Sequence, residues 1–136
     1  MLLLAGCGLR PVDVEPYEPQ AGTAEVCRSL VAALPRSIED AVRRDVDSVV
    51  RTTAAAWGDP PVVLRCGVEL PADYRPDAQV SEVDGVAWFT SEGEGGTFFA
   101  TVGRTAVVEV AVPDDYAPAP VLVALADAVA VNVPED

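Results

Sequence analysis

Short β-rich runs separated by strong turn signals fill the middle of the chain and limit its fold more than any other feature. The GDPP stretch at 58–61 separates one pair of runs, the DG dipeptide at 84–85 a second, and the GR dipeptide at 103–104 a third. Each pair is typical of a β-hairpin, in which neighbouring strands are antiparallel. The polar SEGEGG stretch at 91–96 is expected to be a flexible loop. The predicted strands are residues 52–57, 62–70, 80–83, 86–90, 97–102 and 105–112.

Helical patterns flank these strands. Residues 23–34 carry their apolar side chains on one helical stripe, between a capping threonine and a terminating proline. Residues 121–133 are apolar almost throughout, which predicts a buried helix, with a final strand as the alternative. A short third helix is predicted from Ser37, whereas residues 46–56 fit helix, strand or loop. We therefore expect an α+β fold with a mainly antiparallel sheet of about five or six strands and about two or three helices packed on one face.

The N-terminus predicts export. The sequence LAGC at residues 4–7 resembles a bacterial lipobox, in which the cysteine thiol receives a lipid, so Cys7 is the expected lipidation site. No positive side chain and only a short apolar stretch precede it, so residues 1–7 are interpreted as a truncated lipoprotein signal segment with its true start further upstream. A chance apolar terminus on a cytosolic protein is the alternative.

Residues 8–23 are rich in proline and acidic side chains and show no apolar periodicity. Proline fixes its backbone dihedral and cannot donate to a strand ladder, so this segment is predicted to be an extended spacer. An ordinary frayed terminus would look the same. The folded part is expected to be a single α+β domain at residues 24–133.

Two further cysteines are expected to point into the core. Cys27 lies on the apolar stripe of the first helix, and Cys66 alternates with Leu64 and Val68 on the apolar face of a strand. In an oxidising compartment such a pair forms a disulfide, which stabilises a fold by about 4 kcal/mol for a loop of about 40 residues. Two free buried thiols are the alternative.

Charge and composition exclude several classes of function. The chain has 22 acidic residues against 9 basic ones and a net charge of −13, which repels phosphate backbones and argues against a nucleic-acid partner. It contains no histidine, so Ser-His and Cys-His pairs and histidine metal ligands are excluded. We expect no cofactor, no metal and no identifiable catalytic residue.

Three side chains form the candidate binding surface. Arg65 is expected to point outward from a strand whose other face is core, beside Trp57 on the facing hairpin strand and near Trp88 of the second hairpin. A guanidinium beside indole rings makes a ligand-facing patch. Structural stacking or an ion pair on the open sheet face is the alternative for Arg65, and core packing is the alternative for the tryptophan.

The order of these signals resembles a known family. The residues that carry the resemblance are Cys27 with Leu30, the AWGDP stretch at 56–60, LRCGV at 64–68, and Gly85 with Trp88. In this order they resemble actinobacterial lipoproteins classed as the domain of unknown function DUF3515. The resemblance covers roughly residues 24–131. It implies a secreted or lipid-anchored envelope protein with two paired cysteines, and it carries no assigned activity.

Together these observations predict an extracytoplasmic protein on the outer face of the cell membrane, attached through its N-terminal lipid. The expected role is a non-enzymatic binding or structural module whose partner is another envelope protein or a cell-wall component. The alternative is a carboxylate-dependent hydrolase acting on cell-wall or other glycans, which requires two carboxyl groups about 5–10 Å apart in a cleft.

Overall fold

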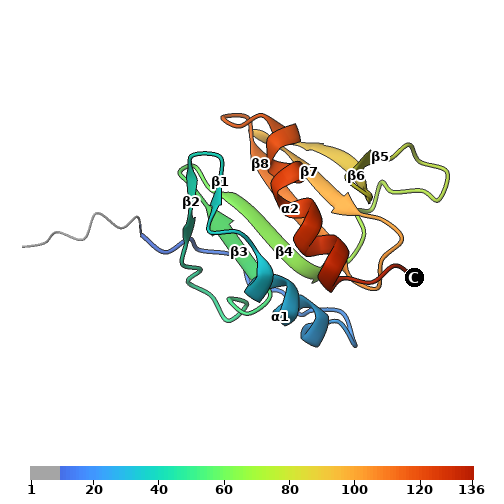
Figure 1. The fold of residues 1–136 in the computed structure, drawn as a ribbon, viewed down its shortest axis with the longest axis horizontal. Coiled ribbons are helices and arrows are strands. Elements are labelled where there is room, and N and C mark those ends of the chain that lie inside the picture. The colour runs from blue at the N-terminus through green and yellow to red at the C-terminus, as the bar shows by residue number, and fades with distance from the viewer. Residues whose placement is uncertain (1–9) are drawn as a thin grey trace, which may run out of the picture.

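The computed structural model describes residues 10–136, in which two helices cover one face of an antiparallel sheet of eight strands (Figure 1). The sheet order is β1-β2-β3-β4-β8-β7-β6-β5. The strands are β1 (Ser37–Ile38), β2 (Ala41–Arg44), β3 (Ala54–Trp57), β4 (Val62–Val68), β5 (Ser81–Val83), β6 (Val86–Gly93), β7 (Gly96–Thr101) and β8 (Val107–Pro113). The helices are α1 (Ala24–Ala33) and α2 (Pro118–Asn132). The α+β class and the antiparallel sheet are confirmed, but the expected five or six strands are too few.

The two additional strands, β1 and β2, come from a segment that was predicted to be a helix. The chain from Ser37 forms the β1–β2 hairpin, with Glu39 at the turn in a left-handed conformation of φ +52°. Strand β2 then pairs with β3, placing Arg43 opposite Trp57. Pairing with a strand distant in sequence outweighs the local helix-start signal at this point. The unassigned residues 46–56 form turns and then enter β3.

The expected flexible loop at 91–96 is also strand for most of its length. Strands β6 and β7 continue to a tight turn, and Gly93 pairs with Gly96 at their ends. The ring of Phe98 covers Gly93 so closely that a Cβ there would collide with it. An aromatic ring packed over a strand glycine supplies the apolar contact that glycine lacks, and this offsets its low strand propensity.

The main core lies between the helices and the sheet. Alternation along β4 turns Val62, Leu64 and Cys66 toward the helices and leaves Val63 and Arg65 on the opposite face, as the sequence predicted. Within residues 10–136, neither helix has the length and apolar character needed to cross a bilayer. The largest fully buried side chains of this core are Trp57, Trp88, Leu30, Ile38, Leu64 and Leu125.

Residues 10–20, which we call the N-terminal strap, cross the sheet face opposite the helices. Val12 forms a parallel bridge with Val46, and Val12 and Val14 are both buried. With Val50, Ala54 and Ala56 they make a second, smaller apolar cluster. The predicted spacer at 8–23 is therefore packed against the domain from residue 10 onward, rather than extending away from it. Cys7, the expected lipidation site, lies outside the described residues.

Candidate functional site

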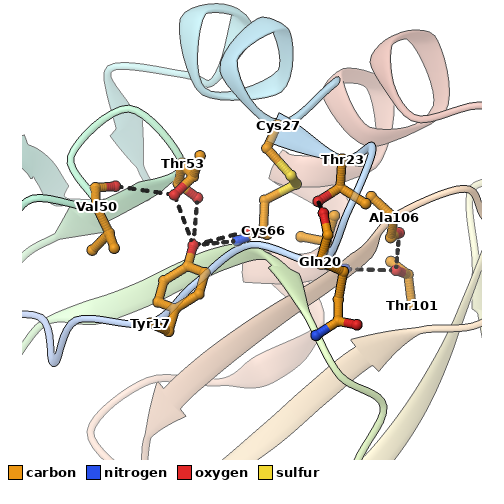
Figure 2. The surroundings of a disulfide bond; sticks show 10 residues. Tyr17, Gln20, Thr23, Cys27, Val50, Thr53, Cys66, Thr101 and Ala106 are labelled. Carbon is orange, nitrogen blue, oxygen red and sulfur yellow. Dashed lines mark hydrogen bonds between the residues drawn. A yellow bond between two sulfur atoms is a disulfide. The ribbon is translucent and has the colours of Figure 1, made fainter. Parts of the chain in front are cut away.

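A disulfide joins Cys27 of α1 to Cys66 of β4, which confirms the predicted pairing (Figure 2). The Cα atoms are 5.4 Å apart, and both residues are fully buried. The bond closes a separation of 39 residues and fixes the first helix to the centre of the sheet. Burial on this scale keeps the sulfurs away from external thiols, as is typical of a structural disulfide.

Tyr17 of the N-terminal strap reaches the backbone of β4 from the sheet face opposite the helices (Figure 2). Its hydroxyl lies 2.9 Å from the carbonyl oxygen of Cys66 and 3.1 Å from that of Thr53, and it accepts a hydrogen bond from the Cys66 N–H at 3.2 Å. It also lies 3.0 Å from the hydroxyl of Thr53. Burial raises the pKa of Tyr17, although these hydrogen bonds and the charge of Arg65 oppose the rise. The strap is thus attached at the cysteine that carries the disulfide.

Gly67 permits the strap to approach this closely. Its backbone has φ +88°, and a Cβ at this position would collide with Thr23 and Pro19. The carbonyl oxygen of Gly67 accepts a hydrogen bond from the Gln20 N–H at 2.8 Å. The glycine after the second cysteine therefore serves both the backbone geometry and the packing of the strap.

Arg65 faces the strap and is only partly exposed to solvent. Its Nε donates to the Oε1 of Glu109 at 3.2 Å, and its guanidinium carbon lies 5.5 Å from the centre of the Tyr17 ring. Strand pairing places Arg65 directly opposite Glu109, so the ion pair follows from the register of β4 and β8. These contacts match the structural alternative for Arg65.

The prediction that Trp57, Arg65 and Trp88 form a binding surface is wrong, because both tryptophans are fully buried on the helix face of the sheet. Trp57 pairs with Val62, so it shares a face with the core residues of β4, while Arg65 pairs with Ala54 on the other face. The Trp57 indole donates to the carbonyl oxygen of Pro35 at 2.9 Å. The turn between β3 and β4 sets this register, and turn residues alone do not reveal it.

Four arginines instead gather at the β1–β2 side of the sheet, and we call this region the arginine edge. A groove of about 470 Å³ is lined by three of them, Arg43, Arg44 and Arg51, together with Asp45. An adjoining groove of about 650 Å³ is lined by Arg36 and Arg43 together with apolar and small side chains. The apolar and small side chains of the second groove are Val31, Ala32, Leu34, Ser37 and Val42.

Two arginines of this edge are held in place by neighbouring groups. The guanidinium of Arg43 lies 5.5 Å from the centre of the Trp57 ring, and burial lowers its pKa while the nearby Asp45 opposes that shift. Arg44 donates to the carbonyl oxygens of Gly58 and Arg10, but its buried Nε has no hydrogen-bond partner among the described residues. Fixed guanidinium groups of this kind recognise carboxylates and phosphates.

These arginines were not among the predicted site residues. Four of the nine arginines fall between residues 36 and 51, and this clustering was the available signal. It was hidden because four carboxylates, Glu39, Asp40, Asp45 and Asp47, are interspersed with them. The folded arrangement shows that Asp45 lines the first of the two grooves and that no carboxylate of residues 10–136 lines the second.

The carboxylates near these grooves are dispersed. No group of three or more histidine, cysteine, aspartate or glutamate side chains within residues 10–136 could hold a metal ion. Each of four grooves described along residues 16–55 is lined by at most one carboxylate. The arrangement offers binding of anions by arginine and no pair of facing acids.

Comparison with known proteins gives one match. The model of a family described as "Protein of unknown function (DUF3515)" matches residues 3–136. No curated protein and no solved structure matches the chain.

Proposed function

The chain belongs to the family DUF3515 of proteins of unknown function, and we propose that it is an exported, lipid-anchored module of the cell envelope. Its proposed role is binding or structural rather than catalytic. The lipid is carried by Cys7, and the folded domain is held on the outer face of the membrane.

The buried Cys27–Cys66 disulfide is the observation that carries this proposal. Stable structural disulfides are typical of oxidising compartments and rare in the cytosol, where thiols are kept reduced. The pair links a helix to a central strand and not two loops, so its oxidation fixes two core elements to each other. A domain built in this way is suited to the outside of the cell.

The packing of the N-terminal strap supports an attachment close to the bilayer. The strap is already bound to the sheet at Val12, five residues after Cys7. A fully extended stretch of that length spans at most about 18 Å. A lipid on Cys7 would therefore hold the domain beside the membrane rather than at the end of a long stalk.

The hydrolase alternative gains no specific observation. It needs two carboxyl groups about 5–10 Å apart across a shared cleft. The grooves described above instead expose arginine side chains, with Asp45 the single carboxylate of the two at the arginine edge. We therefore retain the binding or structural role.

Fractionation of the producing cells, combined with labelling by a fatty-acid analogue, tests the proposal. The natural protein is expected in the membrane fraction with the label on Cys7. The Cys7→Ser variant is expected to lose the label and to leave the membrane, while its Cys27–Cys66 disulfide stays intact. An unlabelled natural protein recovered from the cytosol would contradict the proposal.

A further inference from the structure

We propose that the arginine edge is a docking surface for the anionic phospholipid headgroups of the membrane that holds the anchor. The inference deepens the proposed function, because it states how the anchored domain is oriented on the bilayer. It concerns Arg36, Arg43 and Arg51 and the exposed side chains around them.

The position of the strap is the first argument. The strap joins the sheet at this edge, since the Val12 N–H donates to the carbonyl oxygen of Asp45 and the Asp47 N–H donates to that of Val12, both at 2.8 Å. Arg44 donates to the carbonyl oxygen of Arg10 at the start of the described chain. Arg10 follows Cys7 by three residues, which span at most about 11 Å. A lipid on Cys7 thus tethers the domain close to this edge of the sheet.

Most charged side chains of the described residues are not in ion pairs. In a chain with 22 carboxylates, the ion pairs found within residues 10–136 are Arg65 with Glu109 and Arg104 with Glu135. The arginines of this edge are in neither pair, and two of them, Arg36 and Arg51, are exposed. Guanidinium groups left without a carboxylate partner are available to the phosphates of anionic lipids, and each basic residue near such a surface strengthens attachment.

Exposed apolar side chains lie among these arginines. Val42 on β2 is 62% exposed, and Val49 in the following turn is 83% exposed. The groove between α1 and β2 adds Val31 and Leu34 to the same region. Basic side chains mixed with exposed apolar ones are typical of surfaces that lie in the headgroup layer.

The remaining charge of the molecule is compatible with this orientation. Residues 69–96 contain seven carboxylates and one arginine, and they include β5 and β6 at the opposite edge of the sheet. Six strand spacings separate β2 from β5, which amounts to about 29 Å across the sheet. Because screening limits charge interactions to about 10 Å at about 0.1 M salt, the net charge of −13 does not prevent contact at the arginine edge. Four carboxylates of the same segment, Glu39, Asp40, Asp45 and Asp47, weaken the attraction locally. Of these, Asp45 and Asp47 line the grooves, where the arginines outnumber them.

The test tethers the full chain to vesicles through its own cysteine. Since Cys27 and Cys66 are bonded to each other, Cys7 is the single thiol available for coupling to a maleimide lipid. Vesicles of phosphatidylcholine alone are compared with vesicles containing about one third phosphatidylglycerol. The rate at which phenylglyoxal modifies each arginine is then measured by mass spectrometry.

On the anionic vesicles, modification of Arg36, Arg43 and Arg51 is expected to slow by about fivefold relative to the neutral vesicles. Arg75, at the opposite edge, is the internal control and should react at the same rate on both. The protection should disappear at about 1 M salt, where the screening length falls to about 3 Å. Because the coupling is chemical, this result does not depend on lipidation in the cell.

Matched variants separate the edge from overall charge. The double variant Arg36→Glu with Arg51→Glu is expected to abolish the protection of Arg43, whereas Arg75→Glu should preserve it. Both altered positions of the double variant are exposed, and circular dichroism checks that the fold is kept. Equal rates on the two vesicle types, or protection of Arg75 as well, would overturn the proposal. Equal protection by free inorganic phosphate on neutral vesicles would also overturn it, because the edge would then be a small-anion site.

Discussion

At the scale of single residues, Tyr17 connects the N-terminal strap to the disulfide-bearing strand. Its hydroxyl lies against the backbone of Cys66 and against Thr53, and its ring contacts the Arg65 guanidinium. A side chain with this many partners contributes through hydrogen bonds and through packing. The surrounding network is shown in Figure 2.

The substitution Tyr17→Phe should lower the free energy of unfolding by about 1–2 kcal/mol, because the polar groups of Thr53 and Cys66 lose a buried partner. Urea unfolding measures the effect. Tyr74→Phe is the matched control, since the Tyr74 ring packs on Phe89 and its hydroxyl makes no hydrogen bond among the described residues. A loss of equal size in both variants would contradict the role given to Tyr17.

The raised pKa of Tyr17 predicts a loss of stability in alkali. The unfolded chain releases this proton near the ordinary value of 10.0, whereas the folded chain keeps it to a higher pH, so unfolding releases a proton in between. The contribution is fully present below about pH 10 and is lost as pH rises through the folded pKa. Burial, Asp115 and Asp59 also raise the pKa of Tyr116, so the comparison is made in a Tyr116→Phe background.

In that background, the free energy of unfolding should fall less steeply above about pH 10 when Tyr17→Phe is added. If the free energy of unfolding falls equally steeply with pH in the presence and absence of the Tyr17 hydroxyl, the pKa of Tyr17 is not raised by folding.

At the scale of elements, the disulfide joins α1 to β4 across the main core. Removing it with Cys27→Ala and Cys66→Ala should lower the free energy of unfolding by about 4 kcal/mol, as the chain-entropy model gives for a loop of this length. Cys7→Ser should leave it unchanged. Thermal and urea unfolding of the two proteins provide the comparison, and a double variant as stable as the parent would contradict a structural role for the bond.

The elements that were predicted correctly have local causes. The apolar stripe of α1, the Asp84-Gly85 turn and the GDPP turn are each encoded within a few neighbouring residues. Strands β1 and β2 were missed because they are strands only through pairing, β1 with β2 and β2 with β3 further along the chain. The burial of Trp57 was missed for the same reason, since its face depends on the register with β4 and not on its neighbours.

At the scale of the whole molecule, the strap is part of the folded domain, and the proline content of residues 8–23 concealed this. The alternation of Val12 and Val14 was the signal that one face of the segment is apolar, and both side chains are buried. The contact partners of the strap, Val46, Val50 and Ala54, lie far along the chain, so no local pattern could identify them.

Hydrogen exchange distinguishes a packed strap from a free stalk. The amide hydrogens of Val12 and Gln20 should exchange slowly, because they donate at 2.8 Å to the carbonyl oxygens of Asp45 and Gly67. The amide of Asp13, which has no acceptor among the described residues, should exchange rapidly and serves as the internal reference. Uniformly fast exchange along residues 10–20 would contradict the packed arrangement.

The proposed location outside the cytoplasm rests most directly on the oxidation of one pair of thiols in the living cell. The direct measurement is mass spectrometry of the natural protein, with thiols alkylated at lysis and no reductant added. The account predicts a cross-linked pair of peptides containing Cys27 and Cys66, two hydrogens lighter than the separate peptides. Recovery of both cysteines as alkylated free thiols would contradict the central claim that this domain is built for an oxidising compartment outside the cytoplasm.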